Sequence, residues 1–294
     1  MSEPAHTVDA VWQRAVVRIA AAGVGDTPRL DAELLVGHVS ELDRVGLRVH
    51  GDRELDAAQV ERIDALVARR ETGEPIAYLL GTAWFHGREF EVDARVLIPR
   101  PETELLVELA LTHFADRATS ATFVDVCTGS GCVGITIAAE LGARARVVAT
   151  DISPDALAVA AANVARLGVE VDLRAGDLLE PVAELRQVAA VVANPPYVEG
   201  ANDAGLTVGV RDHEPHIALF VPDDEHVDAF YARLAAGALP ILEPGGLLAV
   251  EHGQGQRGPV TAALHAVGFV DVAGLDDLAG IDRVVVGYRP PGAS

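Results

Sequence analysis

From about Phe123 to the end of the chain, short apolar runs alternate with longer stretches of helical periodicity. Strands separated by helices connect through right-handed crossovers, so the pattern predicts a mainly parallel, doubly wound α/β sheet. Such a sheet binds its ligands at the carboxyl ends of its strands. Seven segments have the length and composition of its strands: 122–126, 146–150, 170–174, 188–193, 246–251, 269–273 and 283–288.

Residues 1–75 show only helical periodicity, with apolar residues recurring every three or four positions. A helix over about 8–19 is followed by one that begins at Thr27 and by a third that begins at Asp56 and ends at Gly73. No catalytic constellation is visible here, so we predict a small helical domain that recognises the substrate. The second helix is expected to bury Leu30, Leu34 and Leu35.

The segment between the helices and the α/β pattern has a different composition. Residues 76–100 place aromatic and β-branched residues around Gly87, which predicts a β-hairpin linker. Pro101 then has the position of a first-turn residue in a new helix. We therefore expect a helical domain over 1–75, a hairpin linker over 76–100 and an α/β domain over 101–294.

The loop after the first strand of the sheet is rich in glycine. Gly129, Gly131 and Gly134 satisfy the pattern G-x-G-x-x-G, which lets the backbone approach a nucleotide-like ligand closely. The next strand ends at Asp151, suited to accept from ribose hydroxyls, and the third is followed by Asp177, suited to accept from an adenine amino group. A tight turn, a helix cap and a loop carboxylate are the structural alternatives. Because all three features fall at successive strand ends, we predict a nucleoside site.

The fourth strand leads directly into Asn194-Pro195-Pro196-Tyr197. Two adjacent prolines remove two backbone donors, so neither helix nor sheet continues through them. A planar amide or amino nitrogen has a delocalised lone pair, and it reacts with a methyl donor only when held with that pair facing the donor. The side-chain oxygen of Asn194 and the carbonyl of Pro195 are suited to accept one N–H each, with Tyr197 stacked on the planar group. We predict methyl transfer to such a nitrogen; a simple strand-terminating turn is the alternative.

Charge and cysteine content argue against several classes of protein. The chain has 23 Lys+Arg against 44 Asp+Glu, a net charge of -21, which does not suit binding to nucleic acid through phosphates. Its two cysteines, Cys127 and Cys132, are too few for a disulfide scaffold or a structural zinc site, and we expect no metal. Without a long apolar run or a secretory signal, we expect a soluble cytoplasmic protein with no membrane partner. The oligomeric state stays unknown.

These motifs resemble the PrmC/HemK family of class I S-adenosylmethionine-dependent methyltransferases, which methylate the glutamine amide of the Gly-Gly-Gln motif in peptide chain release factors. The resemblance implies a Rossmann-like, seven-stranded sheet, S-adenosylmethionine as cofactor, S-adenosylhomocysteine as product, and release factors as partners without direct contact to nucleic acid. It extends over nearly the whole chain, through EPIAYLLG (74–81), LIPRPETE (97–104), DVCTGSG (125–131), ATD (149–151), NPPYV (194–198), VRDHEP (210–215) and EHG (251–253).

The resemblance also implies roles for individual residues. The glutamine would be bound, and the catalytic group formed, by Asn194, Pro195, Pro196 and Tyr197. Arg100 and Glu102 would shape the entrance for the substrate. The cofactor would be held by Cys127, Thr128, Gly129, Ser130, Gly131, Asp151, Asp177, Leu178 and Asn194.

Three positions depart from the family pattern. Cys127 stands where glycine is common, which a side chain tolerates if the residue keeps a negative φ. Ile281 stands where the residue is often more polar, and the segment 218–226 lacks a glycine pair that many members have. These departures weaken the prediction of the methyl-accepting substrate more than the prediction of methyl transfer. A ribosomal protein glutamine, or a small amino-acid-like metabolite with an amide or guanidine, therefore remains an alternative acceptor.

Two other functions differ in kind. Asn-Pro-Pro-Tyr also occurs in DNA methyltransferases that modify adenine or cytosine amino groups, but such enzymes need a basic segment to hold phosphates. A cofactor-binding adaptor that docks release factors without chemistry would not need Asn194 and Tyr197. His213 and His216 are more typical of a solvated loop than of a metal site, and Glu251-His252 of a structural role beneath the site.

Overall fold

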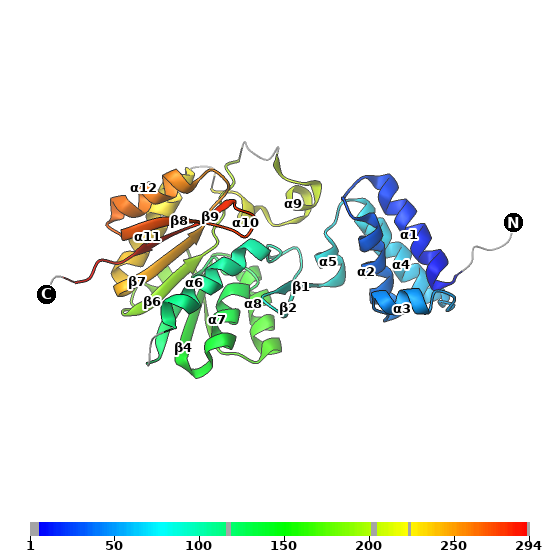
Figure 1. Ribbon diagram of the computed structural model, residues 1–294, viewed down its shortest axis with the longest axis horizontal. Helices are drawn as coiled ribbons and strands as arrows, with labels where there is room; N and C mark the ends of the chain where they lie inside the picture. The colour runs from blue at the N-terminus through cyan, green and yellow to red at the C-terminus, as the bar shows by residue number, and fades with distance from the viewer. Residues whose placement is uncertain (1–5, 116–118, 201–204, 223–224, 293–294) are drawn as a thin grey trace. The chain divides into compact units, whose positions relative to one another are not determined.

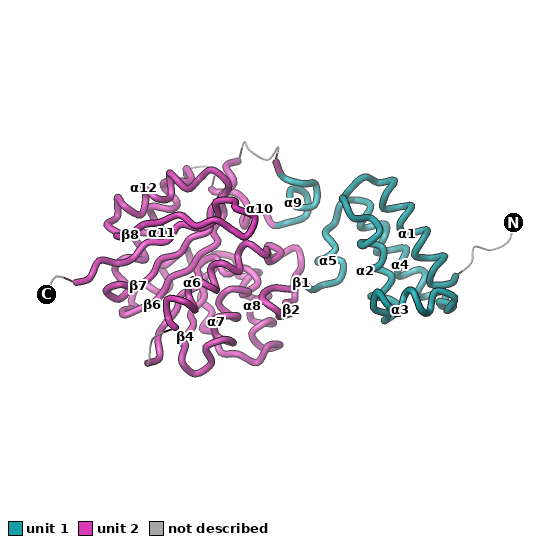
Figure 2. Tube along the Cα trace, viewed as in Figure 1, with its two compact units in different colours: residues 1–82, 206–214 teal, residues 83–205, 215–294 magenta. Residues whose placement is uncertain are grey.

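The computed structural model describes residues 6–115, 119–200, 205–222 and 225–292. Its contacts divide the chain into two units, shown in Figure 2. The first contains Met1–Thr82 and Leu206–Glu214, and the second contains Ala83–Gly205 and Pro215–Ser294. Among the described residues, no helix combines the length and the apolar character needed to cross a bilayer.

The first unit is helical. Its elements are α1 (Val8–Ala22), α2 (Pro28–Ser40), α3 (Arg44–Val49), α4 (Ala57–Glu71), α5 (Ile76–Leu80) and α9 (Val208–His213). The three predicted helices are present, and the capping box of α4 forms between Asp56 and Gln59. The prediction for Leu30 is wrong: its exposed fraction is 36%, because α2 turns Ala32, Leu35 and Val36 into the core of the helical unit instead. Helices α3 and α5 are additional to the sequence prediction.

A short segment distant in sequence belongs to the helical unit. Val208, at the start of α9, packs on Gly73, and the Nε2 of His213 lies 3.2 Å from the carbonyl oxygen of Thr72. The segment Leu206–Glu214 begins nine residues after the turn at 194–197 (206 − 197). The helical unit is therefore discontinuous in sequence.

The hairpin consists of β1 (Thr82–Phe85) and β2 (Arg88–Glu91). His86 and Gly87 connect the strands with φ values of 47° and 72°. Positive φ at both central residues is the geometry of a type I′ turn, whose twist matches that of the strands it joins. The hairpin is preceded by α5, so the segment 76–80 is helical rather than extended.

The second unit contains a seven-stranded sheet in the order β5-β4-β3-β6-β7-β9-β8. Only β9 against β7 and β8 against β9 are antiparallel, which confirms the predicted mainly parallel sheet. Because β3 pairs with both β4 and β6, the strand order reverses at this place. The strands are β3 (Ala121–Val126), β4 (Ala145–Asp151), β5 (Val171–Ala175), β6 (Val188–Ala193), β7 (Leu242–Glu251), β8 (Val270–Asp276) and β9 (Asp282–Tyr288).

Helices cover both faces of this sheet (Figure 1). One face packs against α6 (Glu104–Phe114), α7 (Cys132–Leu141) and α8 (Pro154–Leu167), and the other against α11 (Val227–Ile241) and α12 (Arg257–Val267). Neighbouring residues such as Phe123 and Val124 belong to opposite faces, as the period of a strand requires. Shorter helical segments are α10 (His216–Leu219) and the 3-10 turns Pro101–Thr103, Gly142–Arg144 and Glu180–Val182.

Candidate active site

Two adjacent strand ends form the candidate site. Val126, the last residue of β3, pairs with Ala193, the last residue of β6. The glycine loop that begins at Cys127 and the turn that begins at Asn194 therefore leave the sheet side by side. Both line one cavity. The sheet thus brings together the two motifs that the sequence placed 67 residues apart (194 − 127).

The backbone of the glycine loop has a conformation that requires glycine. Gly129 and Gly131 have φ values of 56° and 82°. A Cβ atom at Gly131 would lie 2.7 Å from the Cδ1 of Ile135, which is shorter than a carbon–carbon contact allows. Gly131 caps α7, whose first-turn N–H groups face the loop.

Cys127 shares the left-handed conformation, with φ of 58°. The condition under which a side chain is tolerated here, a negative φ, is therefore not met. A non-glycine residue in this region is strained by roughly 1–2 kcal/mol because its Cβ approaches the following carbonyl oxygen. The thiol is inert as an acid, since burial raises its pKa well above the usual value.

Buried side chains hold the glycine loop from two sides. The carboxylate of Asp125 accepts hydrogen bonds from the hydroxyl of Thr128 at 2.5 Å and from the N–H of Gly134 at 2.9 Å. From α8, the Nδ2 of Asn163 donates to the carbonyl oxygen of Ser130 at 2.9 Å. Burial raises the pKa of Asp125 to about 7. The loop is therefore fixed by groups that do not belong to it.

Asp151 lies at the end of β4 and lines the same cavity. Its two carboxylate oxygens accept from the N–H of Gly129 and the N–H of Ser153, each at 2.9 Å. Burial raises the pKa of Asp151, and these two N–H groups oppose the shift. Asp151 therefore orders the loop and the start of α8, and each oxygen retains a lone pair for a ligand.

A neighbouring cavity lies beside the first and shares Cys127 and Asp151 with it. Asp177, Leu178 and Pro196 line this second cavity. Asp177 forms an ion pair with Arg233 from α11. Apart from Gly131, which lines neither cavity, the predicted cofactor residues thus border two adjoining cavities at the ends of β3, β4, β5 and β6.

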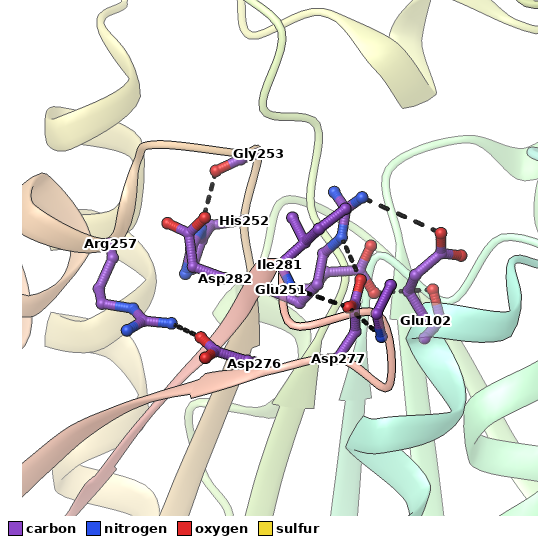
Figure 3. Close-up of polar contacts among 12 residues, drawn as sticks. Glu102, Glu251, His252, Gly253, Arg257, Asp276, Asp277, Ile281 and Asp282 are labelled. Atoms are coloured by element: carbon purple, nitrogen blue, oxygen red, sulfur yellow. Dashed lines mark hydrogen bonds and ion pairs between the residues drawn. The ribbon is translucent and has the colours of Figure 1, made fainter.

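Asn194 is oriented by a hydrogen-bond chain. Its Nδ2 donates to the hydroxyl oxygen of Thr103 at 3.0 Å, and that hydroxyl donates to the Oε2 of Glu251 at 2.7 Å. Thr103 and Glu251 are 3% and 2% exposed. Burial is also the main reason why the pKa of Glu251 is raised to about 7. Figure 3 shows Glu251 among the polar contacts at this end of the sheet.

Tyr197 is held by a hydrogen bond to its backbone carbonyl and by close packing of Gly253 on its ring. The Nε2 of Gln256 donates to the carbonyl oxygen of Tyr197 at 2.8 Å, and the Oε1 of Gln256 accepts from the N–H of Gly253 at 2.9 Å. A Cβ at Gly253 would lie 3.1 Å from the Cδ2 of Tyr197, so glycine permits the close approach of the ring. Burial raises the pKa of Tyr197 to about 12. The phenol is therefore neutral near neutral pH.

Arg100 and Glu102 face different surroundings. Arg100 lines the cavity that contains Asn194. Glu102 lies 3.9 Å from the Nη2 of Arg283 and borders a groove with Asp277 and Leu278 (Figure 3). Of the two predicted entrance residues, only Arg100 lies at the cavity itself.

The histidines noted in the sequence have structural surroundings. The imidazole of His252 is fully buried beside Glu251, its Nδ1 is 2.8 Å from the carbonyl oxygen of Gly253, and burial lowers its pKa. His216 packs against the ring of Phe220. Within the described parts of the chain, no group of three or more His, Cys, Asp or Glu residues is arranged to hold a metal ion.

Four side chains of the site were missed by sequence reasoning. Asn163 and Gln256 make bridging contacts that only the tertiary structure creates, and they lie in an ordinary helix and a loop. Asp125 and Thr103 lie inside the quoted motifs DVCTGSG and LIPRPETE, so the motifs contained a signal for them. A buried acid at the end of a strand just before a glycine loop is such a signal.

The lining fits S-adenosylmethionine. The loop after β3 offers backbone at close range, and the carboxylates of Asp125 and Asp151 suit both ribose hydroxyls and a cationic ligand. The strand order, with the cavity at the ends of β3 and β4, is that of class I S-adenosylmethionine-dependent methyltransferases. Family models agree: residues 10–81 match the PrmC N-terminal domain, and residues 102–209 match the methyltransferase small domain.

Relatives along almost the full length make the assignment narrower. The chain is 42% identical to a release factor glutamine methyltransferase of Koribacter versatilis, over 90% of this chain and 92% of the relative. It is 43% identical to that of Moorella thermoacetica, over 94% and 96%. The chain belongs to the release factor glutamine methyltransferase family. A solved methyltransferase structure from Pyrococcus furiosus aligns with 77% of this chain and 98% of that chain at 15% identity and a TM-score of 0.49, too distant to inform function.

Proposed function

We propose that this chain transfers a methyl group from S-adenosylmethionine to the side-chain amide nitrogen of the glutamine in the Gly-Gly-Gln motif of peptide chain release factors. The observation that carries the proposal is the place of Asn194. It follows β6, lines the cavity formed with the loop after β3, and turns its NH2 group toward Thr103. The relatives named release factor glutamine methyltransferase support this acceptor.

The cofactor supplies a methyl group bonded to a positively charged sulfur atom. The backbone of 127–131 would hold it, with Asp151 accepting from the ribose hydroxyls and with Asp177 and Leu178 beside the adenine. The carboxylates in the two cavities favour a cation, since they are partly removed from solvent. Asn194 lines the same cavity and would adjoin the bound cofactor.

The turn after β6 binds the glutamine. The Oδ1 of Asn194 and the carbonyl oxygen of Pro195 each accept one N–H of the amide, which fixes the direction of the nitrogen lone pair. The prolines hold both acceptors rigidly, and Tyr197 covers the planar group. Arg100 at the cavity, and Glu102 at the groove beside Asp277, would border the approach of the substrate. As the new N–CH3 bond forms, the S–CH3 bond would break and leave S-adenosylhomocysteine, and the amide nitrogen would then release one proton to solvent. Orientation and the exclusion of water by these residues lower the barrier without a strong base.

The helical unit contacts the protein substrate in this proposal. Its match to the PrmC N-terminal domain model, which is separate from the methyltransferase domain, supports this role in substrate contact. An intact release factor is then a better substrate than a short peptide containing Gly-Gly-Gln. The acceptor takes part in translation termination, so the proposed reaction takes place in the cytoplasm, and the net charge of -21 argues against direct contact with nucleic acid.

One labelling experiment tests the function. The protein is incubated with methyl-labelled cofactor and, in separate reactions, a purified release factor, ribosomal proteins, DNA or free glutamine, and the label is located by mass spectrometry. We expect label on the glutamine of Gly-Gly-Gln. Asn194→Ala is expected to lose this transfer while cofactor binding, measured by calorimetry, persists. Label on another acceptor, or full turnover by Asn194→Ala, would overturn the proposal.

A further inference from the structure

A series of two hydrogen bonds, the first buried and the second partly buried, runs from Glu251 through Thr103 to Asn194. The three residues come from the end of β7, from the 3-10 turn before α6 and from the end of β6. Thr103 is separated from Asn194 by 91 residues and from Glu251 by 148, so the fold alone brings them together. Both Thr103 and Glu251 are almost fully buried. Water therefore does not compete easily for these groups.

The donors and acceptors of this chain determine its direction. An ionised carboxylate only accepts hydrogen bonds, so Glu251 takes the single hydroxyl hydrogen of Thr103. The oxygen of Thr103 then has only lone pairs to offer, and the neighbouring amide must present its NH2 group. This is the arrangement observed, with the Nδ2 of Asn194 at 3.0 Å. The amide oxygen of Asn194 is thereby turned away from Thr103.

We propose that Thr103 and Glu251 are positioning residues that set the orientation of the Asn194 amide, so that its oxygen and not its NH2 group meets the glutamine nitrogen. This inference rests on the proposed function, in which Asn194 accepts an N–H of the acceptor. If the Asn194 amide were reversed, its NH2 group would face the NH2 group of the substrate glutamine. The glutamine would then lose this hydrogen bond. Thr103 borders the cavity beside Asn194 and Glu251 lies behind it, and in this inference both act through the Asn194 amide.

Protonation of Glu251 reverses the direction of both hydrogen bonds. A neutral carboxyl group donates to the oxygen of Thr103, which frees the threonine hydrogen to donate to the amide oxygen of Asn194. The pKa of Glu251 is raised to about 7 by burial, so both directions fall within an accessible pH range. The titratable and charged groups that face Glu251 from the surrounding elements are Arg100, Glu102, Cys132, Tyr197, Tyr231 and Arg283.

Two substitutions at Thr103 separate the hydroxyl from the side-chain volume. Thr103→Val keeps the shape and removes the hydroxyl, whereas Thr103→Ser keeps the hydroxyl. We expect Thr103→Val to lower kcat on the release factor roughly 10- to 100-fold, because the Asn194 amide without its hydrogen-bond partner loses its fixed orientation. Thr103→Ser restores most of kcat, and the Kd of the cofactor changes little in either. Thermal melting shows that both variants are folded.

The pH profile tests Glu251. At saturating cofactor, the kcat of the wild type is expected to fall about tenfold per pH unit below about pH 7, as the ionised fraction of the carboxyl falls. Glu251→Gln has no ionisation, so this acidic limb disappears and kcat is intermediate, because Gln presents either an oxygen or an NH2 group to Thr103. Equal kcat for Thr103→Val and the wild type, equal losses in Thr103→Val and Thr103→Ser, or an unchanged acidic limb in Glu251→Gln would overturn the inference.

A measurement that does not depend on turnover tests the orientation of Asn194 separately from the proposed function. In asparagine-labelled protein, the side-chain NH2 resonance of Asn194 is expected to titrate near pH 7 in the wild type and not in Thr103→Val or Glu251→Gln. A titration that persists in both variants, or is absent from the wild type, contradicts the proposed positioning role of Thr103 and Glu251. Failure of the wild type to methylate a release factor contradicts the proposed function, and the NMR result still decides the orientation of Asn194.

Discussion

Replacement of Asn163 tests how the cofactor loop is held. The side chain of Asn163 is fully buried in α8 and makes three hydrogen bonds. Its Oδ1 accepts from the N–H of Glu91 at 2.7 Å, and its Nδ2 donates to the carbonyl oxygens of Glu91 at 3.0 Å and of Ser130 at 2.9 Å. One amide thus joins the hairpin strand β2 to the glycine loop.

Asn163→Ala would leave these three backbone groups without their partner. The carbonyl oxygen of Ser130 is buried, and an unsatisfied buried group costs about 1–3 kcal/mol, while the partly exposed groups of Glu91 regain water. We therefore expect the free energy of unfolding to fall by about 1–3 kcal/mol. The glycine loop loses one of its fixed points, so we expect the Kd of the cofactor to rise roughly tenfold, equivalent to about 1.4 kcal/mol.

Urea denaturation and calorimetry measure the two effects. Asn163→Asp is the matched control, because it keeps the shape of the side chain but places an acceptor against the two carbonyl oxygens. If the hydrogen bonds matter, the Asp variant is at least as unstable as the Ala variant; if only volume matters, it is as stable as the wild type. A loss below about 0.5 kcal/mol in Asn163→Ala, with an unchanged cofactor Kd, would refute the reasoning.

Two further predictions concern the same loop. Cys127→Gly relieves the strain of the left-handed backbone, so we expect the urea midpoint to stay the same or to rise by the equivalent of up to about 1 kcal/mol. Cys127→Val is expected to lower the midpoint. A marked loss of stability in the glycine variant would contradict the strain argument. Asp125 has a pKa raised to about 7, so its carboxylate is ionised above that pH and neutral below it. Cofactor affinity is therefore expected to fall as the pH is lowered from about 8 to about 6, and Asp125→Asn to remove this dependence; a flat wild-type profile would exclude Asp125 as the cause.

The sheet was predictable from the sequence because its strands are fully buried and separated by helices. The run VAAVVA at 188–193 is buried at every residue, and such a run followed by two prolines is difficult to mistake for a helix. The order of β9 and β8 was not predicted, since no local pattern specifies which of two terminal strands lies inside. In α2, the helical periodicity placed Leu30 on the buried face, but the packing of α2 against α1 and α4 leaves it exposed.

The candidate site was predictable to the extent that it consists of contiguous motifs. The loop at 127–131 and the turn at 194–197 were found because glycine and proline restrict the backbone in recognisable ways. The supporting contacts of Thr103, Asn163 and Gln256 were not, because each joins segments far apart in the sequence. The conformation of Cys127 was missed for a related reason: the loop geometry is imposed by its surroundings, against the preference of the residue.

The most direct test of this account is a crystal structure with S-adenosylhomocysteine and a glutamine peptide bound. We predict that the Oδ1 of Asn194 and the carbonyl oxygen of Pro195 each lie within hydrogen-bonding distance of the glutamine amide nitrogen, with the Nδ2 of Asn194 still on Thr103. If both oxygens instead point away from that nitrogen, the turn after β6 does not position the acceptor, and the account is contradicted.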